Sequence, residues 1–284
     1  MMHVHRSVGI VLVGGLSSRM GTSKALLEWH GSTLARRVVG IVARGVDGPV
    51  VVVRSAGQSL PSLPREIEVL DDLENGRGPL AGLAVGLAAL SGRGEVAYVS
   101  STDVPFLHPV FVRRVLGEVG DDVEAGVPCV RGFRQTLAAA YRVDLACRVK
   151  QLVDEDRLRL SYLLETCRWV ELDEALLLAD ADLARIDPGL ESVTNLNELS
   201  DYEAARAKPA PTVVVERTGQ LLPDQAHGPR FVRAATLGAA ADAAGTPLAG
   251  DIVAVLNGDQ ISHDPEEPTV EGDVISLMSA ADNR

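Results

Sequence analysis

Short apolar runs alternate with helix-like segments between residues 8 and 119 of this 284-residue chain. The runs are rich in β-branched residues, which is typical of strands buried inside a sheet, and they span residues 8–13, 49–53, 67–70 and 96–100. The other segments have the apolar spacing or the Ala/Leu content of helices, over residues 32–44, 80–90 and 109–119. This order predicts an α/β fold with a mostly parallel sheet covered by helices. Because such sheets bind ligands beyond the C-terminal ends of their strands, we expect functional residues there.

A proline-rich break near residue 208 divides the chain. The segment Lys208–Pro211 cannot continue a helix and is typical of a linker. From Lys208 onward the chain has 5 basic and 11 acidic residues, which is half of the net charge of −12. Strand-like runs at 212–216, 251–256 and 273–278 and an Ala-rich helix at 234–244 predict a small α+β domain. We therefore expect a large domain over 1–207, a linker over 208–211 and a small domain over 212–284.

Charge and composition exclude several classes of partner. With 39 acidic and 27 basic residues, the chain lacks the basic surface of a nucleic-acid or anionic-membrane binder. No apolar run approaches the ~18–20 residues that span a bilayer, and the N-terminus lacks the pattern of a signal peptide. Three widely spaced cysteines, at 129, 147 and 167, predict reduced thiols in or near the core. We expect a cytoplasmic protein without nucleic-acid or membrane partners.

The strongest motif follows the first strand, where Gly14 and Gly15 open a small polar loop that leads to Lys24. Glycines let the backbone approach phosphate oxygens closely, and successive N–H groups of a loop can surround an anion. Arg19 and Lys24 add positive charge. The spacing matches neither the Walker pattern nor G-x-G-x-x-G. The loop predicts a phosphate site, and the alternative is an ordinary glycine-rich turn with two solvated cations.

Three further motifs lie at the expected places. One combines Gly78 with Pro79 where a helix would start. Asp103, just after the strand at 96–100, offers the kind of carboxylate that Mg²⁺ takes beside bound phosphates. Asn195 and Asn197 point the same way if their segment is extended, and could help to hold a metal or phosphate. The respective alternatives are a tight helix entry, a helix N-cap at Asp103 and a turn formed by the asparagines.

In this order and spacing, the four motifs resemble those of the MobA-like nucleotidyltransferases, the molybdenum cofactor guanylyltransferase family, over about residues 7–205. The resemblance implies a Rossmann-like fold and Mg²⁺-dependent transfer of GMP from GTP to molybdopterin, with release of pyrophosphate. It implies catalytic roles for Arg19, Lys24 and Asp103, of which Asp103 would also bind the metal. It further implies nucleotide binding at Leu12, Val13, Gly14, Gly15, Lys24, Asp72 and Asp103, and acceptor or metal contacts at Gly78, Pro79, Leu80, Asn195 and Asn197.

Two departures from the family pattern leave the nucleotide base open. Val13 stands where the family usually has Ala, and Arg54 stands where it tends to have Asn. The nucleoside contact is also open between Asp72 and its neighbour Asp71. One alternative function is therefore cytidylyl transfer, or transfer to another acceptor such as a phosphosugar. Another is a non-catalytic partner protein in cofactor assembly.

The segment 212–284 resembles the small β-grasp (ubiquitin-like) sulfur carriers of the MoaD and ThiS type, through the run Ile252–Gly258 and the later run Glu271–Leu277. Such carriers finish in Gly-Gly, whereas this sequence finishes Ala-Ala-Asp-Asn-Arg. We therefore expect no sulfur-carrier activity. The resemblance implies instead a stabilising module, or a docking surface for proteins of molybdenum cofactor assembly.

Overall fold

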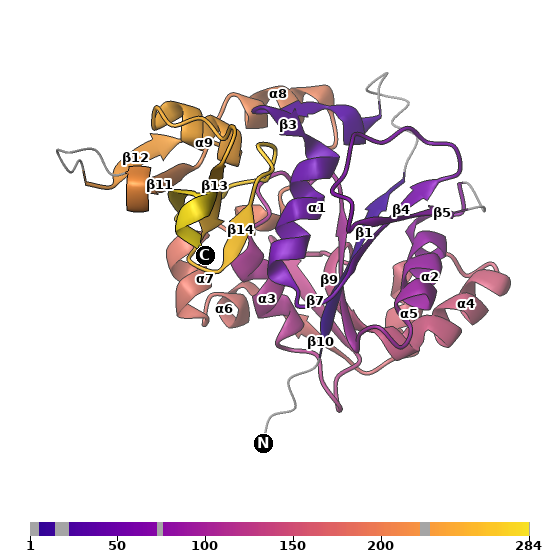
Figure 1. Ribbon diagram of the computed structural model, residues 1–284. Helices are drawn as coiled ribbons and strands as arrows, with labels where there is room; N and C mark the ends of the chain where they lie inside the picture. Colours follow the sequence, from indigo (N-terminus) through magenta and orange to yellow (C-terminus); the bar gives the residue numbers. More distant parts are fainter. Residues whose placement is uncertain (1–5, 15–22, 73–75, 222–227, 284) are drawn as a thin grey trace. The chain divides into compact units, whose positions relative to one another are not determined.

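The computed structural model describes residues 6–14, 23–72, 76–221 and 228–283 (Figure 1). The chain forms two compact units. The first comprises Met1–Leu27 and Leu34–Glu198, and the second comprises Glu28–Thr33 and Leu199–Arg284. The sequence predicts a large α/β domain and a small α+β domain, separated by a linker at 208–211. The two units of the structure divide after Glu198. None of the helices in the described part of the chain is long and apolar enough to cross a membrane.

The first unit is built on one sheet with the strand order β10-β7-β9-β6-β1-β4-β5, and β8 pairs with β7. All neighbouring strands from β6 to β5 are parallel, and β9 is antiparallel to β6 and to β7. The expected Rossmann-like α/β fold with a mostly parallel sheet is therefore confirmed. The strands are β1 (Ser7–Val13), β4 (Val50–Ser55), β5 (Glu68–Asp72), β6 (Val96–Ser101), β7 (Ala125–Val130), β8 (Phe133–Arg134), β9 (Ala138–Arg142) and β10 (Trp169–Leu172).

Helices cover both faces of this sheet, with α2, α4 and α5 on one face and α1 and α3 on the other (Figure 1). Side chains of β1 and α2 form the centre of the first core, and α2 lies very close to β1. A Cβ at Gly86 would meet Ile10 at 2.8 Å, so only glycine permits this approach. The helices are α1 (Leu34–Gly45), α2 (Pro79–Leu90), α3 (Pro109–Leu116), α4 (Ala146–Asp154), α5 (Leu160–Leu164), α6 (Glu174–Leu177) and α7 (Ala181–Ile186), with 3-10 turns η1 (Lys24–Leu26), η2 (Val143–Leu145) and η3 (Glu191–Val193).

Two sequence expectations need correction. The run at 67–70 was expected to be a buried strand, but β5 lies at the edge of the sheet and Val69 is 40% exposed. An edge strand has one neighbour instead of two, so its side chains retain contact with solvent. The cysteines are free, as expected, yet Cys147 is exposed on α4. Burial raises the pKa of the half-buried Cys167 thiol to about 11, so this thiol stays protonated at neutral pH.

Glu124 joins the start of β7 to the residue that precedes β10. Its carboxylate accepts a hydrogen bond from the backbone N–H of Arg168 at 2.8 Å and lies 3.3 Å from the guanidinium of Arg148. These partners lower the pKa of Glu124 below its ordinary value of 4.5, and the backbone hydrogen bond makes the largest contribution to this shift. A lowered pKa means that the ionised carboxylate stabilises the fold above pH 4.5, and that this stabilisation is lost as the pH falls further.

We expect Glu124→Gln to lower the free energy of unfolding by about 1 kcal/mol at pH 7, because the charged partners lose their anion. The difference in Tm between wild type and variant should shrink as the pH falls below 4.5. Thermal unfolding followed by circular dichroism between pH 3 and pH 7 measures it, with the exposed Glu155→Gln as control. A difference that stays constant across this range would contradict the assignment.

The second unit contains a five-stranded sheet with the order β12-β11-β15-β13-β14. Its central pair, β11 and β15, is parallel, and the other pairs are antiparallel. Helix α9 packs on one face of this sheet, an α+β arrangement that is compatible with the predicted β-grasp. The elements are β2 (Glu28–Trp29), β3 (Ser32–Thr33), α8 (Leu199–Arg206), β11 (Thr212–Arg217), η4 (Gly219–Leu221), β12 (Arg230–Arg233), α9 (Leu237–Ala243), β13 (Ile252–Leu256), β14 (Gln260–Ser262), β15 (Val274–Ser279) and η5 (Ala280–Asn283).

Polar contacts explain why the short hairpin β2–β3 and α8 belong to this second unit. The Tyr202 hydroxyl of α8 donates to the backbone carbonyl of Glu28 at 2.6 Å, and Arg206 forms an ion pair with the Glu28 carboxylate. On the hairpin's other strand, the Ser32 hydroxyl donates to Glu266 at 3.2 Å. These contacts link the hairpin to both ends of Leu199–Arg284, so the second unit is discontinuous in sequence.

Candidate active site

Lys24 and Asp103, which are 79 residues apart in sequence, meet in the first unit. The Lys24 ammonium lies 3.3 Å from Asp103 Oδ2 and donates a 2.6 Å hydrogen bond to the backbone carbonyl of Leu196. Both charged side chains keep about a fifth of their surface exposed, 23% for Lys24 and 21% for Asp103. The ammonium is thus fixed by two acceptors while it remains accessible to a ligand. Sequence motifs from the beginning, middle and end of the unit converge on this point.

The position of Asp103 is fixed by the end of β6 and by the segment around Leu196. The Ser101 hydroxyl donates to Asp103 Oδ1 at 2.6 Å, and the Leu196 N–H donates to the Asp103 backbone carbonyl at 2.9 Å. The alternative role of Asp103 as a helix N-cap is excluded, because α3 is capped by His108, which accepts from the Val110 N–H. The carboxylate therefore lies at the C-terminal end of a buried strand without a capping function.

The two asparagines flank Leu196, the residue that Lys24 contacts through its backbone. Asn195 is half-buried, and its amide donates to Gln135 Oε1 at 3.4 Å and to the Val193 carbonyl at 3.3 Å. Asn197 is exposed. The motif therefore lies close to Lys24 and Asp103, as expected. The contacts with these two residues are made by the backbone of Leu196, which lies between the asparagines.

A cavity of about 410 Å³ lies at the C-terminal ends of β1, β4, β5 and β6 and at the start of α2. Its size is within the range of small-molecule sites. Ser101 lines it and also contacts Asp103, so the cavity adjoins the charged pair. The lining residues are Leu12, Gly14, Val53, Arg54, Ser55, Asp72, Gly76, Gly78, Pro79, Gly82, Ser101 and Leu137.

Strand alternation decides which predicted residues line the cavity. Leu12 and Gly14 line it, whereas Val13 is 2% exposed and does not. Gly78 and Pro79 line it at the start of α2, but Leu80 is fully buried in the core beside the cavity. Any contact of Val13 or Leu80 with a ligand in this cavity would therefore be through the backbone or through packing.

The same alternation separates the two neighbouring aspartates of β5. Asp72 pairs in register with Ser55 and lines the cavity. Asp71 pairs in register with Arg54, and its carboxylate accepts a hydrogen bond from Arg54 Nε at 2.7 Å. Arg54 also donates to the Gln58 carbonyl at 2.9 Å, so its guanidinium is held on the face of the sheet that carries Asp71 and not on that of Asp72. Of the two aspartates, Asp72 is the one that lines the cavity.

Two predicted residues, Gly15 and Arg19, lie outside the described residues. Other participants carried little sequence signal. Ser101 precedes Asp103 by two residues, which is a spacing that allows a local hydrogen bond, and it could have been suspected. Gln135 and the backbone of Leu196 carry no signal, because their contacts join segments far apart in the chain.

The donor set of this site suits a divalent cation held mainly by phosphates. Within the described ranges, no group of three or more His, Cys, Asp or Glu side chains could hold a metal alone. Asp103 offers one carboxylate, and Asn195 offers an amide oxygen nearby. Mg²⁺ typically takes one or two carboxylates together with water and substrate phosphates, so these residues fit such an ion.

Comparison with known proteins identifies the family. Residues 9–223 match the model of the MobA-like NTP transferase domain. The chain belongs to this family. It is therefore a nucleotidyltransferase, and the convergence of Lys24, Asp103 and Leu196 is the candidate for its active site. The divalent metal expected of such enzymes fits the donors described above.

Relatives with assigned names cover more than half of this chain. A protein of Mycobacterium tuberculosis (strain ATCC 25618 / H37Rv) named "Probable molybdenum cofactor guanylyltransferase" is 38% identical over 200 residues, 69% of this chain and 91% of the relative. A Bacillus cytotoxicus protein of the same name is 32% identical over 170 residues, 58% of this chain and 84% of the relative. The crystal structure of molybdopterin-guanine dinucleotide biosynthesis protein A from Archaeoglobus fulgidus has a TM-score of 0.55 and 23% identity, covering 70% of this chain and 96% of that chain, and shows the same fold.

Proposed function

We propose that this protein transfers GMP from GTP to molybdopterin and releases pyrophosphate. The observation that carries the proposal is the Lys24 ammonium held beside Asp103, which Ser101 links to a cavity of about 410 Å³ in a MobA-like domain. Two relatives that cover 58% and 69% of this chain are named "Probable molybdenum cofactor guanylyltransferase". The molecule thus has the groups that such a transfer needs.

The chemistry requires positioning and charge neutralisation more than acid–base catalysis. An oxygen of the molybdopterin phosphate forms a bond to the α-phosphorus of GTP, and the bond from that phosphorus to the bridging oxygen breaks, so pyrophosphate leaves with the electron pair. Because the attacking phosphate is already anionic, no side chain has to remove a proton from it. Lys24 offsets the repulsion between the two polyanions and the charge that develops at the reacting phosphorus.

The cavity and its neighbours would bind the two substrates on either side of this lysine. The nucleoside would occupy the cavity between Gly14, Asp72 and Gly78. Asp103, with Asn195 and Asn197 nearby, would hold the divalent ion, for which we propose Mg²⁺; when bound, it supplies positive charge to the phosphates. Lys24 is kept in place by the Leu196 carbonyl, so it does not depend on the metal for its position.

Arg54 keeps a second nucleotide open. Arg54 is one of the residues that line the cavity, and its guanidinium is bound to Asp71 and to the Gln58 carbonyl. Arg54 stands where MobA-like sequences tend to have Asn, so the lining of the nucleotide cavity departs from the family pattern at this position. Cytidylyl transfer to the same acceptor is therefore the alternative that a specific observation supports.

Pyrophosphate release tests the proposal directly. The purified protein is incubated with Mg²⁺ and each of GTP, CTP, ATP and UTP, with and without molybdopterin or its molybdenum-loaded form. We expect release with GTP, and only when the pterin is present. Release with CTP and pterin would replace guanylyl by cytidylyl transfer, and the absence of release with any nucleotide and either acceptor would overturn the proposal.

A truncated chain that ends at Lys208 is expected to retain measurable transfer. Lys24, Asp103, Leu196 and all residues that line the cavity belong to the first unit, whereas 209–284 belongs to the second. The kcat of the truncated and full-length proteins, measured at the same temperature, checks this prediction. If the truncated protein unfolds, the predicted domain boundary at 208–211 is wrong. If it folds but loses all turnover, residues 209–284 contribute to transfer and not only to the docking of cofactor-assembly proteins that we propose for them.

A further inference from the structure

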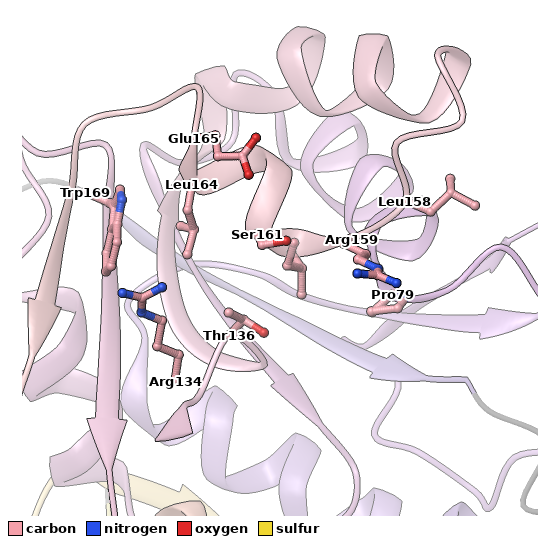
Figure 2. A pocket seen from close by; sticks show the side chains of 10 residues that line it. Pro79, Arg134, Thr136, Leu158, Arg159, Ser161, Leu164, Glu165 and Trp169 are labelled. Atoms are coloured by element: carbon pink, nitrogen blue, oxygen red, sulfur yellow. The ribbon is translucent and has the colours of Figure 1, made fainter. Parts of the chain in front are cut away.

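A second cavity, of about 540 Å³, lies in the first unit next to the nucleotide cavity (Figure 2). It is formed by the start of α2, the turn between β8 and β9, helix α5 and strand β10. Pro79 lines both cavities, so the two share a wall. The roles assigned so far to Lys24, Asp103 and the nucleotide cavity do not use this space.

One wall of the second cavity is a planar stack. The guanidinium of Arg134 lies 4.8 Å from the centre of the Trp169 ring, in a cation–π arrangement that Figure 2 shows on one side of the cavity. Arg134 Nε also donates to Glu171 at 2.8 Å, which fixes the plane of the guanidinium. Apolar side chains of α5, Leu160 and Leu164, continue the lining. Such a wall suits a flat heterocyclic ring.

The opposite rim carries an uncompensated positive charge. The other charged residues that line the cavity are paired: Arg134 with Glu171 at 2.8 Å, and Glu165 with Arg157 at 3.1 Å. The Arg159 side chain makes no hydrogen bond or ion pair with any residue in the described ranges. Its guanidinium is drawn near Pro79 on the side of the cavity away from Trp169 (Figure 2). In a chain with a net charge of −12, an accessible cation without a counter-ion indicates a place for an anionic group.

Four consecutive residues connect this cavity to the active site. Arg134 and Thr136 line the second cavity, and Leu137 lines the nucleotide cavity. Between them, Gln135 accepts a hydrogen bond from Asn195, which adjoins the Leu196 carbonyl that binds Lys24. A molecule in the second cavity could therefore extend one end toward Lys24, where the reacting phosphates would meet.

We propose that the second cavity holds the planar heterocycle of the acceptor, stacked on the Arg134–Trp169 pair, with Arg159 bound to an anionic substituent of that acceptor. The inference rests on the proposed function, because molybdopterin is the acceptor that joins a pterin ring to a phosphate. To the proposed function it adds a role for Arg134, Trp169 and Arg159, which would select a flat, anionic acceptor. The two cavities then place nucleoside and acceptor on opposite sides of Pro79, with their phosphates toward Lys24.

Binding of pterin-6-carboxylate, a flat pterin with one anionic substituent, tests this assignment without catalysis. The chain has two tryptophans, and Trp29 is 3% exposed in the second unit. In full-length Trp29→Phe protein, Trp169 is the only source of tryptophan emission, and we expect the probe to quench it. Arg159→Gln in this background should weaken probe binding about tenfold, because a charge-assisted contact is lost.

Arg134→Gln should weaken probe binding several-fold through loss of the stacked guanidinium, and it should raise the KM for molybdopterin with little change in kcat or in GTP affinity. The control is Arg185→Gln, which removes an exposed arginine that pairs with Asp182 on α7. Equal probe affinity in all variants, or GMP transfer to molybdopterin by a protein that does not bind the probe, would overturn the assignment of the cavity. Arg159-dependent probe binding without any GMP transfer would support the cavity as a pterin site and would overturn the proposed function instead.

Discussion

Replacing Asp103 with alanine is expected to lower the rate of Mg²⁺-dependent pyrophosphate release by at least about a thousandfold. The substitution removes the carboxylate that would hold the divalent ion and one of the two acceptors that fix the Lys24 ammonium. Folding should survive, because the Asp103 side chain is outside the core and its backbone contact with Leu196 does not need the carboxylate. Steady-state kinetics with GTP and molybdopterin, together with a thermal unfolding curve, measure both expectations.

Two further variants make this experiment specific. Asp103→Asn keeps the size of the side chain and an acceptor for Lys24 and Ser101, so turnover as low as that of the alanine variant assigns the effect to the negative charge. Asp154→Ala is the matched control, because Asp154 pairs with Lys150 at 2.7 Å on the exposed surface of α4. If Asp103→Ala retains full activity, the metal-binding role of Asp103 is wrong.

The parallel part of the fold was predictable because its signal is local. Buried parallel strands such as β1 and β4 are continuous β-branched runs, and α2 is an Ala/Leu segment that starts at a proline. The sequence gives no such signal for β7, which contains Gly126 and Pro128. Both residues are depleted in strands, and only pairing with β9 and β10 makes this segment extended.

The sequence motifs predicted which residues meet in the candidate site, but not how they are arranged there. The motifs containing Lys24 and Asp103 were found because strand ends in α/β sheets carry functional groups. Pairing register then decides between neighbours in a way that no local pattern shows: Asp71 pairs with Arg54, and Asp72 lines the cavity. The contact of Lys24 with the Leu196 carbonyl spans 172 residues and uses a backbone atom, so residue types could not reveal it.

Replacing Lys24 with methionine is the second large effect we expect, a fall of about a thousandfold in kcat with a much smaller rise in the KM for GTP. The reason is that the cavity residues bind the nucleoside, whereas the ammonium acts mainly on the charge that develops during transfer. Methionine keeps the length and the apolar stem of lysine, so packing around η1 should change little. Measuring kcat and KM separately distinguishes this role from simple loss of GTP affinity.

Lys150→Met is the control for this variant, since Lys150 is 71% exposed and forms its ion pair with Asp154 within one turn of α4. Lys24→Arg adds a second comparison, because arginine keeps the charge but presents a planar group that does not fit the two acceptors held by lysine. We expect partial activity in the arginine variant and unchanged activity in Lys150→Met. A Lys24→Met protein that only binds GTP more weakly, with an unaltered kcat, would assign Lys24 to substrate binding instead of to the transfer step.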